Sequence, residues 1–145
     1  MKKKVLLFLL MALPLFIASC SKDDGDVDNM KWKSEVSISS DGYFHLPPDG
    51  GTFVFQCTNY SSFWINRVTE QEAYGKEKEF TPAYDDHEDL TITSNWLTAS
   101  RNGNTLTVTI QPTTLDSNRF MKVSVQSGDT FYEFHFKQRG LKVGL

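Results

Sequence analysis

The chain has 145 residues, of which 39% are hydrophobic and 23% are charged, and its formal charge at pH 7 is −3. This length suits one domain with one core. The composition excludes a collagen-like repeat, a disulfide-dense miniprotein and an intrinsically disordered chain. The acidic balance argues against a nucleic-acid partner, because nucleic-acid-binding domains normally carry a basic face.

Residues 1–19 have the pattern of a secretory signal peptide. Lysines at positions 2–4 precede an uninterrupted apolar run from Val5 to Ile17. A helix of that length covers about 20 Å, which is short of the roughly 30 Å hydrocarbon core of a membrane. The basic start, the short apolar run and the small residues after it therefore predict a cleaved signal rather than a permanent membrane span.

The sequence Ile17-Ala18-Ser19-Cys20 matches the lipobox of bacterial lipoprotein precursors. In those precursors the cysteine is acylated and becomes the first residue of the mature chain, so the match implies lipidation of Cys20. Acyl chains contribute about 0.8 kcal/mol per buried CH₂ and hold such a protein on a bilayer. Without the three lysines of the signal, 12 basic residues face 18 acidic ones, a formal charge of −6. Anionic headgroups repel such a chain, so we expect the lipid to supply the membrane contact.

The residues that follow are polar and acidic, and 20–31 is predicted to be a lipidated, flexible tether. Its start, Ser21, Lys22, Asp23 and Asp24, resembles the surface-export signal of Bacteroidota lipoproteins. The resemblance implies that the protein is anchored in the outer membrane and faces the cell exterior.

The rest of the chain alternates apolar and polar residues, with the period of two that is typical of β-strands. Leu106, Val108 and Ile110 are separated by threonines, whose branched side chains suit the outer face of a strand. The same alternation recurs in Phe53–Cys57, Met121–Val125 and Tyr132–Phe136.

Turn-forming residues separate these runs. Asn102-Gly103 suits a two-residue hairpin loop, in which both central residues need positive φ. Pro47–Gly51 and Ser127–Asp129 are further turns. Short strands with regular turns predict an all-β domain over 32–145, an immunoglobulin-like antiparallel β-sandwich of about seven strands.

Cys57 is the thiol that is left once Cys20 carries lipid. It shares strand parity with Phe53 and Phe55, which predicts a small buried hydrophobic side chain. The alternative, a reactive nucleophile, needs a positioned base, and the neighbouring sequence supplies none.

A polar, acidic stretch around 67–93 interrupts the alternation and is predicted to be an inserted loop. Thr69–Glu72 has the spacing of a capping box, which allows a helical turn there, and a short hairpin is the alternative. His87 lies among carboxylates that could hold a cation such as Ca²⁺. An acidic run without a defined loop template is usually only solvated, so we expect no metal and no cofactor.

Several short motifs follow one another in the order and spacing of a known family. They are Gly50-Gly51-Thr52, Trp64, Trp96-Leu97-Thr98, the strand Leu106–Ile110, Arg119, and Gln138 with Gly140. In this order the segment resembles the BACON domain of Bacteroidota, an immunoglobulin-like sandwich. The resemblance implies a non-catalytic, carbohydrate-binding role.

The sequence holds no nucleophile elbow, phosphate-binding loop, zinc-type cysteine spacing or dinucleotide fingerprint, and we expect no enzyme activity. Sugar recognition would use aromatic rings, which stack on the apolar face of a pyranose. One or both tryptophans would alternatively lie in the core, whereas tyrosines in loops are expected to be exposed. The candidate glycan-binding residues are Tyr60, Trp64, Tyr74, Tyr84 and Trp96.

These patterns together predict a surface-exposed lipoprotein that binds glycans of host mucin or dietary polysaccharide. The alternative is a spacer, an adhesin or a protein-interaction module without sugar affinity. A surface protein would then be the partner in place of a glycan.

Overall fold

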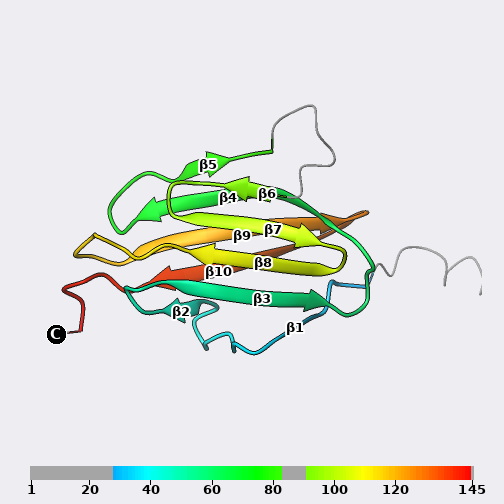
Figure 1. Ribbon diagram of the computed structural model, residues 1–145, viewed down its shortest axis with the longest axis horizontal. Helices are drawn as coiled ribbons and strands as arrows, with labels where there is room; N and C mark the ends of the chain where they lie inside the picture. The colour runs from blue at the N-terminus through cyan, green and yellow to red at the C-terminus, as the bar shows by residue number, and fades with distance from the viewer. Residues whose placement is uncertain (1–27, 83–90, 145) are drawn as a thin grey trace, which may run out of the picture.

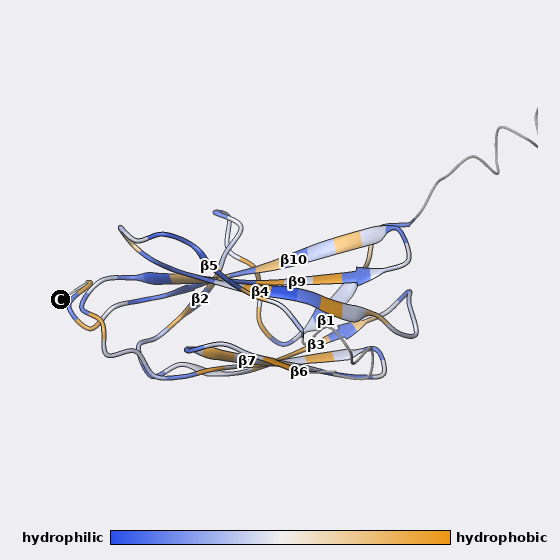
Figure 2. Cartoon of the chain, turned by 90° about the horizontal axis from the view of Figure 1, so that it is seen from above, coloured by the Kyte–Doolittle hydropathy of each residue, from blue (hydrophilic) through white to orange (hydrophobic). Residues whose placement is uncertain are grey.

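The computed structural model describes residues 28–82 and 91–144, and these form ten strands in two five-stranded sheets (Figure 1). Seen from above, the sheets lie as two separate layers of a sandwich (Figure 2). Among the described residues no helix is long and apolar enough to span a membrane.

The first sheet has the order β1-β3-β8-β7-β6, and all its neighbouring strands are antiparallel. Threonines line much of its outer face, and Leu106, Val108 and Ile110 are buried as predicted. Its strands are β1 (Trp32–Ser34), β3 (Gly51–Cys57), β8 (Thr105–Ile110), β7 (Leu97–Asn102) and β6 (Thr91–Thr93).

The second sheet has the order β2-β10-β9-β4-β5. Its one parallel pair joins β2 to β10, and the other pairs are antiparallel. Met121, Val123 and Val125 are buried on its inner face as predicted. Its strands are β2 (Phe44–Leu46), β10 (Thr130–Gln138), β9 (Arg119–Ser127), β4 (Trp64–Glu72) and β5 (Lys78–Phe80).

This strand order confirms the immunoglobulin-like sandwich. In the nomenclature of that fold, β1-β3-β8-β7 corresponds to A-B-E-D and β10-β9-β4 to G-F-C. Their number is the number of strands that the sequence predicts. The other three, β2, β5 and β6, are edge strands of three residues each. Three residues are too short for an alternating pattern to be visible in the sequence, so the ten observed strands exceed the predicted number.

The helical turn that the sequence allows at Thr69–Glu72 is not formed, because these residues are the end of β4. The alternative, a short hairpin, is confirmed, because β5 pairs with β4 in antiparallel fashion. Glu70 is buried and Thr69 faces the other side of the sheet, so the polar residues at both positions concealed the strand alternation. The stretch expected as an inserted loop around 67–93 therefore holds the end of β4, then β5, which pairs with it, and β6. Residues 83–90, with Tyr84 and His87, lie outside the described residues.

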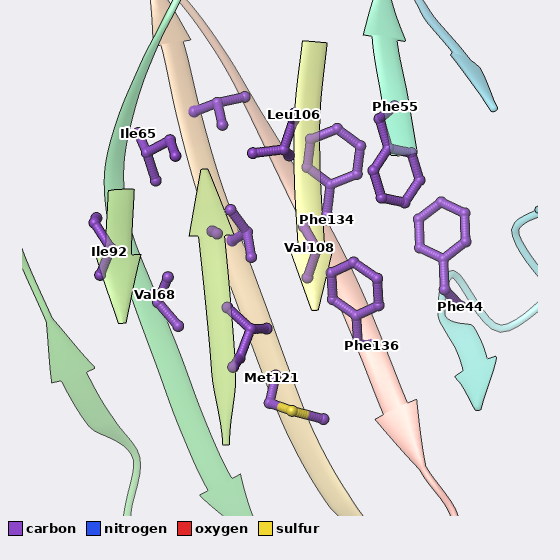
Figure 3. Packing of buried hydrophobic residues seen from close by; sticks show 14 of the residues in the cluster. Phe44, Phe55, Ile65, Val68, Ile92, Leu106, Val108, Met121, Phe134 and Phe136 are labelled. Atoms are coloured by element: carbon purple, nitrogen blue, oxygen red, sulfur yellow. The ribbon is translucent and has the colours of Figure 1, made fainter. Parts of the chain in front are cut away.

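The core is built by phenylalanines that meet between the two sheets (Figure 3). The ring centroids of Phe55 and Phe134 are 4.5 Å apart, and Phe44 and Phe136 pack beside them. Cys57 is fully buried and has a free thiol, which confirms its prediction as a small buried hydrophobic side chain.

Two turns depend on glycine backbone geometry. The hairpin predicted at Asn102-Gly103 lies one residue later, because Asn102 pairs with Thr105 and the loop is Gly103-Asn104. Only Gly103 has positive φ, at 60°, as in a type II′ turn, so the expectation of two positive values is wrong. Gly50 has φ 74°, and a Cβ there would collide with the carbonyl oxygen of Ile110. The turn between β2 and β3 therefore requires glycine at this position.

Candidate functional site

The outer face of the β2-β10-β9-β4-β5 sheet carries a hollow lined by aromatic and polar side chains. On β9 the residues between the buried ones point outward, since side chains alternate along a strand. Phe120 is paired with Gln71 of β4 and Lys137 of β10, and Lys122 is paired with Thr69 and His135. Directly paired residues share a face, so these side chains lie side by side on the outside of the sandwich.

A groove of about 250 Å³ crosses this face near the start of β9, and we call it the aromatic groove. Tyr43 packs against the rings of Phe120 and His135. Its ring centroid is 5.7 Å from that of Phe120 and 5.9 Å from that of His135, in edge-on geometry. The residues lining the groove are Tyr43, Thr69, Gln71, Ala73, Glu77, Phe120, Lys122 and His135.

Polar groups surround these rings. Lys122 Nζ lies 3.0 Å from Glu77 Oε2, which ties the β4–β5 turn to β9. Gln71 Nε2 donates to the carbonyl oxygen of Gly75 at 3.2 Å, and His135 lies 3.5 Å from Glu133. The groove therefore combines apolar ring surface with side-chain donors and acceptors, held on paired strands.

A second aromatic feature lies on the same face at the other end of β9, and we call it the aromatic row. Gln126 of β9 pairs with Trp64 of β4 and with Phe131 of β10. Trp64 is 48% exposed and Phe131 is 60% exposed. Two strand spacings separate the two rings, about 10 Å. Six residues of β9 separate Gln126 from Phe120 in the groove, which is about 20 Å.

Of the glycan-binding residues predicted from the sequence, the four that the structure describes do not form one platform. Trp64 is exposed at the start of β4, and Tyr74 is 98% exposed in the turn that follows the end of β4. Tyr60 is half-buried, and its hydroxyl donates to the carbonyl oxygen of Asp28 at 2.5 Å. Tyr84 lies outside the described residues, as do the lipidation and export residues Cys20, Ser21, Lys22, Asp23 and Asp24.

Trp96 belongs to a buried polar cluster formed with Glu70, Arg119 and Gln138. The Arg119 guanidinium lies 4.5 Å from the centroid of the Trp96 ring, and the Trp96 backbone N–H donates to Glu70 at 2.7 Å. Arg119 Nε donates to Gln138 Oε1 at 2.7 Å. Gln138 Nε2 in turn donates to the carbonyl oxygens of Pro48 and Gln111. Trp96 is thus engaged in holding the two sheets together at this end.

The charge of Arg119 is held inside the protein. Burial lowers the pKa of its guanidinium from the ordinary value, and the negative charge of Glu70 acts in the opposite direction. A guanidinium stays protonated even so, because its ordinary pKa is far above neutral pH. Arg119, Gln138 and Trp96 are all residues of the motif series in the sequence, so these motif positions build the fold.

Sequence reasoning missed four aromatic residues of this face, Tyr43, Phe120, Phe131 and His135. For Phe120 and Phe131 the sequence contained a signal. Each directly precedes a residue whose side chain points inward, so by the alternation along a strand its own side chain points outward. Large apolar residues at outward positions are candidates for contact with a partner.

Metal ligands do not gather in the part of the chain that the structure describes: no group of three or more His, Cys, Asp or Glu side chains could hold an ion. His87 and the carboxylates next to it in sequence fall outside that part.

A solved NMR structure of a protein from Bacteroides thetaiotaomicron is similar to this chain. The sequences are 32% identical, and the match covers 83% of this chain and 94% of that one with a TM-score of 0.66. This chain belongs to the same family as that protein. No protein-family model and no curated protein matches the chain. Membership of this family agrees with the sandwich fold, and the resemblance to the BACON domain stays a prediction.

Proposed function

We propose that this protein is a lipid-anchored, surface-exposed lipoprotein of the outer membrane whose BACON-like sandwich binds glycans without catalysis. The observation that carries the proposal is the aromatic groove. A sugar ring has an apolar face and a rim of hydroxyl groups. Phe120 and Tyr43 offer ring surface for the apolar face, while Thr69, Gln71 and the Lys122–Glu77 pair offer partners for hydroxyls.

The position of the groove supports the same proposal. The described chain begins at Asp28, which contacts Tyr60 just after the end of β3. The groove lies at the opposite end, where β9 begins and β10 ends (Figure 1). A lipid at the N-terminus would thus be attached at the end of the sandwich that is farther from the groove. Thr69, Gln71, Phe120, Lys122 and His135 of the groove lie on paired strands, so little ordering entropy is lost at these positions when a ligand binds.

Replacing Phe120 with alanine is expected to weaken glycan binding at least about tenfold, because burying an aromatic ring against a ligand contributes about 1.5–3 kcal/mol. The measurement is a glycan array with the full chain, followed by titration with the strongest ligand. Val54→Ala is the matched control, because Val54 is exposed on the outer face of the other sheet and is expected to leave affinity unchanged. A parent protein that binds no glycan would refute the proposal and favour the spacer or protein-interaction alternative.

The anchor is tested separately. Cys20→Ala is expected to move the protein from the membrane fraction to the soluble fraction, because the acyl chains are its proposed membrane contact. Protease added to intact cells is expected to degrade the parent protein. Membrane retention of the Cys20→Ala variant would contradict lipid anchoring, and full protection from protease on intact cells would contradict the surface location.

A further inference from the structure

A second hollow adjoins the aromatic groove where β2 pairs with β10, and we call it the basic pocket. Its volume is about 390 Å³. The polar side chains that line it are those of His45, Lys137, Arg139 and Asn118. No carboxylate lines the pocket among the described residues, although the mature chain has a formal charge of −6. The pocket therefore concentrates positive charge on an acidic protein.

Lys137 of the basic pocket lies next to the aromatic groove. Lys137 is paired with Phe120 on one side and with His45 on the other. Its Nζ lies 5.8 Å from the centroid of the Phe120 ring, in cation–π contact. A ligand stacked on Phe120 would thus have a cation at its edge.

The donors of this pocket are available to a ligand. Within the described ranges 28–82 and 91–144, Lys137 and Arg139 make no ion pair with a carboxylate. Asn118 accepts the Gly140 N–H through Oδ1 at 3.1 Å, and its Nδ2 has no partner in these ranges. Two cations and one amide donor are the groups that bind a carboxylate or a sulfate.

His45 is engaged differently, since its Nε2 lies 2.7 Å from Asp41 Oδ2. Desolvation acts to raise the pKa of Asp41, but hydrogen bonds from Tyr43 and His45 and the charges of His45 and Lys137 lower it overall. The positive charge of Lys137 is therefore felt on the neighbouring loop. Asp41 occupies His45 and leaves Lys137 and Arg139 for a ligand.

We propose that the basic pocket binds an anionic substituent of a glycan, a carboxylate or a sulfate, while an adjacent sugar ring stacks in the aromatic groove. This inference rests on the proposed glycan-binding function and narrows its ligand to acidic glycans. Lys137 and Arg139 bind the anion, and Phe120 and Tyr43 bind the sugar. Neighbouring strands are about 4.8 Å apart, so the acidic group lies on the stacked sugar or on the next one.

The test compares ligands that differ only in charge. Polygalacturonate oligosaccharides and their methyl esters are titrated against the full chain in detergent, and κ-carrageenan oligosaccharides, whose charge comes from sulfate alone, are compared with their neutral desulfated form. We expect the charged member of at least one pair to bind about tenfold more tightly. The carboxylate pair and the sulfate pair distinguish the two sources of the anion. The preference is expected to weaken as salt is raised from low ionic strength to 0.5 M.

Substitutions in the basic pocket test whether the preference for acidic glycans arises there. Arg139→Gln and Lys137→Gln are each expected to reduce affinity for the acidic ligand about tenfold, while affinity for its neutral partner stays unchanged. Lys33→Gln is the control, because Lys33 lies on β1 in the other sheet and should have no effect. An acidic preference that survives both pocket variants would overturn the inference.

The failure of this inference is distinguishable from the failure of the proposed function. If the parent binds neutral glycans as well as acidic ones, the assignment of the basic pocket is wrong and the glycan-binding function stands. If it binds no glycan on the array, both are wrong.

Discussion

Replacing Arg119 with leucine is expected to lower the free energy of unfolding by about 3–5 kcal/mol, the cost of removing one partner from a buried charged cluster. Arg119 is only 3% exposed. The substitution leaves Gln138 Oε1 without its Arg119 donor in the interior and removes one of the two side-chain donors to the carbonyl oxygen of Gln111. It also leaves the buried carboxylate of Glu70 without the nearby cation. The loss is measured as a shift in the urea unfolding midpoint at unchanged slope.

Arg67→Leu is the matched control for this experiment. Arg67 also lies in the β2-β10-β9-β4-β5 sheet, but it is exposed, and its contacts to Glu79 and Glu133 are 3.7 and 3.8 Å long. Exposed ion pairs of this kind contribute about 0–1 kcal/mol. If Arg119→Leu cost no more than Arg67→Leu, the buried polar cluster would have no special role in joining the sheets.

The sandwich class of this protein could be predicted because several of its strands alternate cleanly. In β8 and in Met121–Val125 of β9 every second residue is apolar and buried, and the sequence shows this directly. β4 does not alternate cleanly, because Glu70 occupies an inward position and a bulge lies between Ile65 and Arg67. A sequence pattern treats every carboxylate as a surface residue. The pattern therefore predicts a loop at the end of β4, where Glu70 is in fact buried.

The buried polar cluster shows what parity can and cannot predict. Arg119 has the same parity as Met121 and Val123, so its strand already places it on the inner face. Its partners Glu70 and Gln138 come from other strands, and Trp96 comes from the residue before β7. Only the pairing of β4 with β9 and of β9 with β10 brings them together. Local sequence contains the parity of each residue but not the pairing.

The candidate site was harder to predict for the same reason. Residue type directed attention to tryptophans and tyrosines, yet Trp96 is part of the buried polar cluster and Tyr74 stands alone in a turn. The aromatic groove combines Tyr43, Phe120 and His135 from three separate segments. Their proximity follows from strand register across β2, β10 and β9, which no single segment encodes.

Replacing Phe134 with alanine is expected to destabilise the fold by about 3–5 kcal/mol, the usual cost of removing a large buried ring. Phe134 is 1% exposed, and its ring centroid lies 4.5 Å from that of Phe55 and 4.9 Å from that of Trp32. The substitution removes this ring from the interface between the sheets and leaves a cavity. The measurement is the change in the free energy of unfolding from urea titration.

Phe131→Ala on the same strand is the matched control, because the two rings differ in burial and not in chemistry. Phe131 is 60% exposed, so its ring buries little apolar area when the protein folds. Its removal is therefore expected to lower the free energy of unfolding by less than about 1 kcal/mol. Equal losses at the two positions would mean that Phe131 is covered in solution. The aromatic row of Trp64 and Phe131 would then be part of an interface, and the loss would depend on protein concentration.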